Sequence, residues 1–235
     1  MKKIFKYIFA GMAAMSVVAC SEDALETSPS SSVSGNELLG TATNALVSLN
    51  GVYRAMYTAG VSNSSNTHQC FGITAYNLVA DVMGEDCIMN GQGSGWFWYD
   101  CVYNVKSRYT STGWRSYDMW NGYYTWISNV NYILAEEETM SGSETEKNYV
   151  LGQAYAVRAY SYFMLAQMFS RTYKGHESEP CVPLYTEPTD IATEGKGRAT
   201  VEEVYQQITS DLDKAITMPV SYTHLRAHET KANLV

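Results

Sequence analysis

A glycine-rich aromatic stretch carries the residue types best suited to binding a neutral ligand. It runs from residue 91 to residue 100 and is followed further along by a Trp-Arg pair. Indole and phenol rings can stack on pyranose rings, and a carboxylate or guanidinium can hydrogen-bond sugar hydroxyls. The alternative is that these aromatic side chains cap the hydrophobic core or contact another protein. The candidate ligand-binding residues are Trp96, Trp98, Tyr99, Asp100, Trp114 and Arg115.

Catalytic chemistry has weaker support in the sequence. Asp81, Glu85 and Asp86 are close together, and a glycosidase uses two carboxylates about 5–10 Å apart across a cleft. Acidic residues at a helix end are more often a solvated cap, and no aromatic-walled pocket is evident around these three. A serine hydrolase would need a Gly-x-Ser-x-Gly turn, which the sequence lacks. We therefore expect no catalytic residue and no cofactor, and keep a glycoside hydrolase as the less favoured alternative.

Four cysteines beyond position 20 leave their chemical state open. In an oxidising compartment Cys70, Cys87, Cys101 and Cys181 have three possible disulfide connectivities, which the sequence cannot rank. Buried free thiols are an equally good interpretation. His68 with Cys70 is a possible metal-ligand pair, but no second pair at close spacing completes a site, so no metal centre is predicted.

The N-terminal residues predict export and a lipid anchor. Three lysines within the first six residues precede a short apolar stretch, and Ala19 leads directly to Cys20. The stretch is too short to span a membrane comfortably. A cysteine in this context is cut at its own amino side and acylated, and each buried methylene adds about 0.8 kcal/mol to membrane binding. We predict a signal peptide over 1–19 and lipidation at Cys20.

The residues after Cys20 predict a flexible tether, followed by an acidic body. Residues 20–35 are acidic and serine-rich, so they cannot bury enough apolar surface to fold. Residues 1–19 hold three of the 16 basic residues and none of the 24 acidic ones, which leaves a net charge of −11 on the remainder. This charge disfavours nucleic acid and anionic lipid surfaces as partners.

Apolar residues recur at helical spacing in five segments, which predicts an all-α body. Small and aromatic residues alternate in the fourth segment, a pattern typical of paired antiparallel helices of the tetratricopeptide kind, although no clean 34-residue repeat is present. The links over 84–115 and 173–199 lack this periodicity and are predicted to be long ordered loops at the surface. The predicted helices are 37–58, 73–83, 116–138, 143–169 and 200 onward.

Two of the predicted helices begin with the same capping signal. Ser143 is followed three residues later by Glu146, and Thr200 by Glu203, the spacing of a capping box. The periodicity of the last helix predicts an inward-facing row that consists of Val204, Ile208, Leu212 and Ala215.

Three motifs occur in order along the chain. Residues 120–131 read WNGYYTWISNVN, residues 154–169 read AYAVRAYSYFMLAQMF with VPL at 182–184, and residues 200–216 read TVEEVYQQITSDLDKAI. Together with the lipid-anchor signal, they resemble the SusD/RagB outer-membrane nutrient-binding lipoproteins: a helix that starts with Trp, the signature helix with its following loop, and the next helix. The resemblance extends over residues 1 to about 219.

The resemblance implies a mostly helical protein without catalysis, held at the outer membrane on the cell exterior. It implies that the protein captures an oligosaccharide or other nutrient and passes it to a SusC-like TonB-dependent transporter. Family members are longer, so residues 36–219 would be a partial, N-terminal helical domain. Residues 220–235 depart from the family pattern and are interpreted as a non-native tail, with no function for His224 or His228. A helical-repeat lipoprotein that binds only protein is the alternative.

Overall fold

The protein is described from a computed structural model that defines residues 39–85, 87–93, 95–103 and 113–218. The chain divides into two units, Met1–Glu37 and Leu38–Val235, and the description below concerns the second. The predicted signal peptide, Cys20, the tether and the tail at 220–235 lie outside the described residues, as does Asp86.

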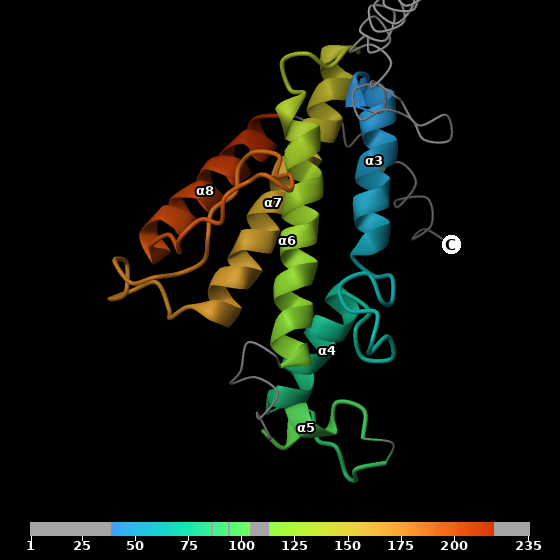
Figure 1. Ribbon diagram of the computed structural model, residues 1–235, viewed down its shortest axis with the longest axis vertical. Coiled ribbons are helices and arrows are strands. Elements are labelled where there is room, and N and C mark those ends of the chain that lie inside the picture. The colour runs from blue at the N-terminus through green and yellow to red at the C-terminus, as the bar shows by residue number, and fades with distance from the viewer. Residues whose placement is uncertain (1–38, 86, 94, 104–112, 219–235) are drawn as a thin grey trace, which may run out of the picture. The chain divides into compact units, whose positions relative to one another are not determined.

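The described residues form helices joined by irregular loops, with no β-strand among them, which confirms the all-α prediction (Figure 1). The helix predicted over 73–83 is found with those bounds, and the other predicted helices differ at their ends by a few residues. A short helix, α5, interrupts the first predicted loop. The elements are α3 (Ala42–Ala55), α4 (Ile73–Met83), α5 (Trp98–Cys101), α6 (Trp114–Ala135), α7 (Glu144–Phe169) and α8 (Val201–Thr217).

The long helices pack side by side, with α7 between α6 and α8, and α3 against both α6 and α7 (Figure 1). Small residues allow this close approach: a Cβ atom on Gly152 of α7 would lie 3.3 Å from Cβ of Met218. The core holds apolar residues that recur at helical spacing in α3, α6 and α7. Its fully buried members include Ala45, Leu49, Tyr123, Ile127, Val130, Ala154, Tyr162 and Leu165.

Both predicted capping boxes are present and fix where α7 and α8 begin. The backbone N–H of Ser143 donates to Glu146 Oε2 at 2.9 Å, and the N–H of Glu146 donates back to Ser143 Oγ at 3.3 Å. Thr200 and Glu203 make the same reciprocal bonds at 2.7 and 3.2 Å. Each carboxylate also accepts from the hydroxyl of its cap residue, at 2.7 Å from Ser143 and 2.9 Å from Thr200. The bonds from the hydroxyl and the N–H of the cap residue lower the pKa of both glutamates, because they stabilise the charged carboxylate.

The inward face predicted for α8 is wrong at one position. Leu212 is 43% exposed, and the neighbouring Asp211 is buried in its place. The reason is Arg158, a buried residue of α7, whose Nε and Nη2 donate to the two carboxylate oxygens of Asp211 at 2.8 and 2.7 Å. A buried guanidinium requires a charged partner, so the carboxylate takes the inward position rather than the leucine.

The loop between α7 and α8 is also more buried than predicted. Cys181 and Val182 are fully buried, and the N–H of Cys181 donates to the carbonyl of Ala199 at 2.7 Å. The same network that holds Asp211 fixes this loop, because Nη1 of Arg158 donates to the carbonyl of Thr186 at 3.1 Å. The prediction of a surface loop therefore holds for part of the segment only.

Candidate functional site

The aromatic stretch before α6 is anchored on a neighbouring loop, residues 68–71. Phe97 has left-handed backbone geometry, with φ of 55°, and its side chain is buried beside Phe71, with ring centroids 6.2 Å apart. Its backbone N–H donates to the side-chain oxygen of Gln69 at 3.1 Å. Phe97 therefore points inward and fixes the residues on either side of it, which include the start of α5.

A buried ion pair joins α5 to α6. Nη2 of Arg115 lies 3.1 Å from Oδ2 of Asp100, and the two residues are 1% and 5% exposed. Nη1 of Arg115 donates to the carbonyl of Gln69 at 3.0 Å, and its guanidinium carbon lies 4.2 Å from the ring centroid of Trp114. Asp100 and Arg115, which were predicted to hydrogen-bond a ligand, are thus buried against each other, and their contacts hold α5 on α6.

The other four candidate residues are aromatic, and their side chains are exposed to solvent to different degrees. Trp96 is 50% exposed and Tyr99 is 54% exposed, while Trp98 and Trp114 are half-buried. The ring of Trp96 lies beside that of His68, with centroids 5.3 Å apart. Trp96 and Tyr99 are therefore the members of the predicted set with ring faces accessible to a ligand.

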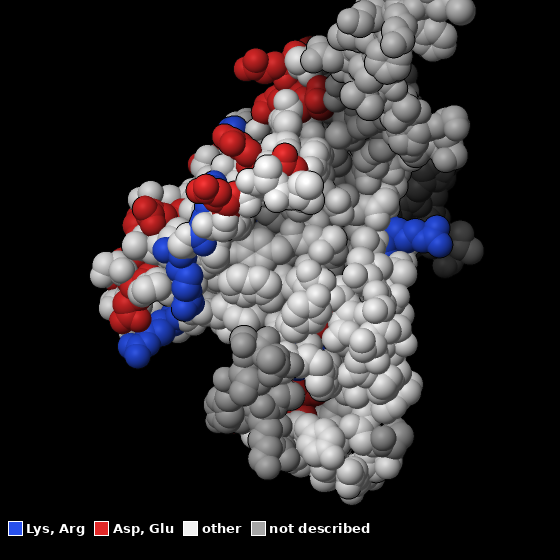
Figure 2. All heavy atoms as spheres, in the orientation of Figure 1, with Lys and Arg blue, Asp and Glu red and all other residues white. Residues whose placement is uncertain are grey.

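Charged side chains are unevenly distributed over the visible face of the protein. In the view of Figure 2 charged side chains gather over α8, over the loops near it and at the end where α6 leads into α7, whereas few appear over the opposite end of α6. The charges of Asp100 and Arg115 are buried against each other, so they add little to the surface potential.

A second buried acid supports the loop under the aromatic cluster, and sequence patterns gave no sign of it. Asp118 of α6 is fully buried and accepts a short hydrogen bond from Oγ of Ser62, while the hydroxyl of Tyr76 donates to its backbone carbonyl at 2.9 Å. Burial raises the pKa of Asp118 and raises that of the neighbouring Cys70 thiol to about 12. The loop over 58–70 is thus held on α6 by buried polar contacts.

The other residues considered for chemistry are spread over several parts of the fold: His68 lies against Trp96, and Cys101 ends α5. Asp81 and Glu85 are exposed at the end of α4. The four cysteines of the described segments are free thiols, of which Cys70 and Cys181 are buried. Within those segments no group of three histidine, cysteine or acidic side chains is placed to hold a metal ion.

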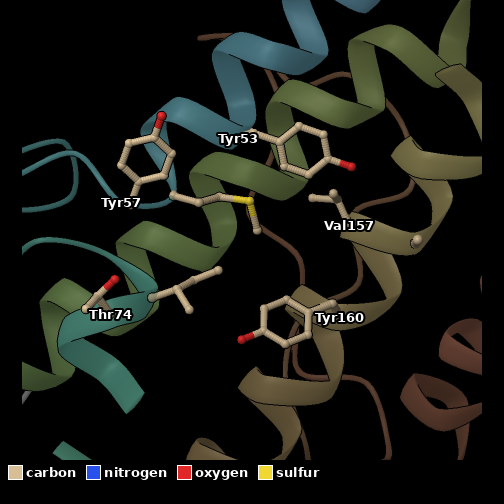
Figure 3. Close-up of a pocket in the computed structure, with 8 residues that line it drawn as sticks. Tyr53, Tyr57, Thr74, Val157 and Tyr160 are labelled. Carbon is tan, nitrogen blue, oxygen red and sulfur yellow. The ribbon is translucent and has the colours of Figure 1, made fainter. Parts of the chain in front are cut away.

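An apolar groove of about 540 Å³ lies between α3, α4 and α7 (Figure 3). Tyr53, Tyr57 and Tyr160 lie around it, and the hydroxyl of Tyr53 donates to Oε1 of Gln153 at 3.0 Å. The sequence gave no signal for this groove because its residues come from segments that are far apart in the chain. The full lining is Tyr53, Met56, Tyr57, Ile73, Thr74, Ala156, Val157 and Tyr160.

The described residues therefore form paired helices with an exposed aromatic loop before α6. The sequence profile of the SusD-like family, described as starch-binding and associating with the outer membrane, matches residues 90–233. The chain belongs to this family, whose description is that of binding proteins. Of the helices in the described segments, none has the length and hydrophobicity that crossing a membrane requires. No protein of curated function matches the sequence.

Solved structures of similar fold agree with the family assignment. A SusD-like carbohydrate-binding protein from Bacteroides vulgatus is 28% identical and superposes with a TM-score of 0.64 over 78% of this chain and 37% of its own. A SusD superfamily protein from Bacteroides thetaiotaomicron is 22% identical, with a TM-score of 0.54 over 76% of this chain and 37% of its own, and supports the fold alone. The chain therefore spans a little over a third of the length of these proteins.

Proposed function

We propose that this protein binds a glycan and does not cleave it. The observation that carries the proposal is the pair of exposed rings, Trp96 and Tyr99, on a loop that the buried Asp100–Arg115 pair holds in place. Preorganised aromatic rings bind sugars at low entropic cost, because little side-chain freedom is lost on association. The family description and the carbohydrate-binding relative support the same ligand class.

The proposed setting is the outer face of the outer membrane. Acyl chains on Cys20 would hold the protein there, with residues 20–35 as the tether and 36–219 as the helical scaffold. A SusC-like TonB-dependent transporter would receive the captured glycan. The family's association with the outer membrane and the sequence preceding Cys20 support this arrangement.

Affinity electrophoresis through gels that contain starch or another neutral polysaccharide tests the glycan-binding proposal. We expect the wild-type protein to be retarded in at least one gel of such a panel, without release of shorter sugars. The double variant Trp96→Ala/Tyr99→Ala should lose retardation, because loss of a stacking aromatic group removes about 1 kcal/mol or more per ring. Tyr57→Ala is the matched control, since it removes an exposed tyrosine from a different surface.

Equal migration of the double variant and the wild type would show that these rings do not contact the glycan. The anchoring proposal has its own test in labelled palmitate, which should attach to the wild type and not to Cys20→Ser. Recovery of a TonB-dependent barrel with the tagged wild-type protein would support the transporter, whereas a barrel without any sugar affinity would favour the protein-binding alternative.

A further inference from the structure

We propose that a second, smaller pocket between α6 and the loop that precedes α8 binds a single neutral sugar ring. The proposal rests on the glycan-binding function for its ligand class, and places a further contact outside the aromatic loop. The pocket has a volume of about 220 Å³. Pockets for drug-sized ligands hold roughly 300–1,000 Å³, so this one admits a single ring rather than a chain. It is lined by Tyr124, Ile127, Ser128, Asn131, Tyr185, Thr189, Asp190 and Thr193.

Two tyrosine rings form an apolar corner of the pocket. The centroids of Tyr124 and Tyr185 are 6.1 Å apart, and the ring planes meet at 84°. The side chain of Ile127, which precedes the polar Ser128 in α6, is buried. A pyranose presents C–H groups on its faces and hydroxyls at its edge, so its face suits such rings and its edge suits polar groups at the rim.

Hydrogen bonds from the core fix this corner before any ligand arrives. The hydroxyl of Tyr124 donates to the carbonyl of Pro183 at 2.7 Å. Nδ2 of Asn131 donates to the carbonyl of Tyr185 at 2.8 Å, and the N–H of Tyr185 donates to the hydroxyl of Tyr162 at 2.7 Å. Asn131 is in turn held by Arg158, whose Nη1 donates to its Oδ1 at 2.8 Å. A preorganised site loses little conformational entropy on binding.

The rim supplies the polar groups that a polyol needs. Oγ of Ser128 and Oγ1 of Thr189 are 3.4 Å apart, a long contact that a ligand hydroxyl can replace. Oδ1 of Asp190 accepts from Oγ1 of Thr193 and from the N–H of Ala192, both at 2.9 Å, and these bonds lower the pKa of Asp190. The carboxylate is therefore ionised at neutral pH and can accept a hydrogen bond from a sugar hydroxyl.

Saturation-transfer NMR on the full chain with methyl α-D-glucopyranoside tests the pocket. We expect transfer to the sugar protons in the wild type and none in Ser128→Leu, which fills the cavity. Asp190→Asn is the second variant, because this exposed residue can change without disturbing the core, and it should weaken binding by about tenfold through loss of a charged acceptor.

Two control results separate this pocket from the aromatic loop. Trp96→Ala/Tyr99→Ala should keep the saturation transfer of the single sugar while it loses retardation by polysaccharide. The pocket proposal is overturned if the wild type shows no transfer, if Ser128→Leu and Asp190→Asn both retain it in full, or if the double loop variant abolishes it. In each case retardation of the wild type in polysaccharide gels would leave the proposed function intact.

Discussion

At the scale of single residues, Arg158 is a buried side chain that hydrogen-bonds to several parts of the fold. It lies in α7, binds Asp211 of α8 through two hydrogen bonds and binds Asn131 of α6 through a third. The same guanidinium contacts the carbonyl of Thr186 in the loop before α8. The buried guanidinium therefore connects three helices and a loop. It also holds Asn131, which lines the small pocket between α6 and the loop before α8.

Removal of the partner carboxylate is expected to destabilise the protein strongly. Asp211→Ala leaves the guanidinium of Arg158 buried without its counter-ion, which costs about 3–5 kcal/mol in the free energy of unfolding. Urea unfolding followed by circular dichroism measures the change. Asp213→Ala, an exposed acid on the same helix, is the control and should change stability by less than about 0.5 kcal/mol. Equal stabilities of the two variants would contradict the role assigned to the pair.

The capping box of α8 predicts a dependence of stability on pH. Hydrogen bonds from Thr200 lower the pKa of Glu203 below its ordinary value of 4.5. A carboxylate whose pKa is lowered by folding stabilises the folded state above the unfolded pKa, and this contribution is lost as the pH falls through the folded pKa. Glu203→Gln should therefore lower the melting temperature at pH 7 and have a smaller effect near pH 3.

Melting temperatures of the wild type and Glu203→Gln between pH 7 and pH 3 measure this difference. Glu194→Gln, an exposed acid in the loop before α8, is the matched control. A gap between wild type and Glu203→Gln that stays constant over the whole pH range would show that the carboxylate charge does not stabilise the cap.

At the scale of elements, the sequence predicts local features well and long-range pairings poorly. The bounds of α4 and both capping boxes follow from residues within a few positions of each other, and the structure confirms them. The exposure of Leu212 does not follow from periodicity, because it depends on a buried arginine 54 positions earlier in the chain. The burial of Cys181 and Val182 likewise depends on contacts that hydrophobic patterns do not encode.

Replacing two glycines by alanine, Gly72 in the turn into α4 and Gly51 within α3, should change the stability of the protein in opposite directions. Gly72 has φ of +69°, and a Cβ atom there would lie 1.9 Å from the carbonyl oxygen of Met56, which already accepts from the N–H of Ile73 at 2.7 Å. Gly72→Ala should destabilise the protein by about 3 kcal/mol, because backbone atoms must shift. Gly51 lies in α3 with nothing within 4 Å of its added Cβ, so Gly51→Ala should stabilise it by about 0.5–1 kcal/mol.

Chemical denaturation of the two variants tests this contrast directly. Gly51→Ala also controls for general effects of replacing glycine by alanine. A Gly72→Ala variant as stable as the wild type would show that the close approach between α3 and α4 is not required.

At the scale of the whole chain, composition and periodicity gave no indication of the apolar groove. It opens about 540 Å³ of apolar space between α3, α4 and α7, and the chain spans a little over a third of the length of its structural relatives. Exposed apolar surface of this kind binds hydrophobic dyes. We expect the full chain to enhance the fluorescence of anilinonaphthalene sulfonate.

A charge placed in the groove should reduce that dye signal. Ala156→Glu introduces a carboxylate at the groove and keeps a good helix former in α7. Val47→Glu is the control, because it places the same charge on an exposed position of α3 away from the groove. Dye binding that falls equally in both variants would show that the groove is not the site of binding.

The candidate ligand site was predictable in part. Residue type alone identified the aromatic stretch, and two of its rings are exposed as a ligand would require. Which members face outward was not predictable, because a sequence motif does not show that Asp100 and Arg115 are buried against each other. The sequence did not predict the small pocket between α6 and the loop before α8, because α6 and residues 185–193 come together only in the folded chain.

The most direct test of the central claim is a calorimetric titration of the full chain with soluble starch-derived oligosaccharides, followed by analysis of the sugar that remains. Binding of a neutral glycan through exposed aromatic rings predicts saturable heat, loss of that heat in Trp96→Ala/Tyr99→Ala, and oligosaccharides of unchanged length. Heat that is retained by this double variant, or oligosaccharides that are shortened by the protein, would contradict the account.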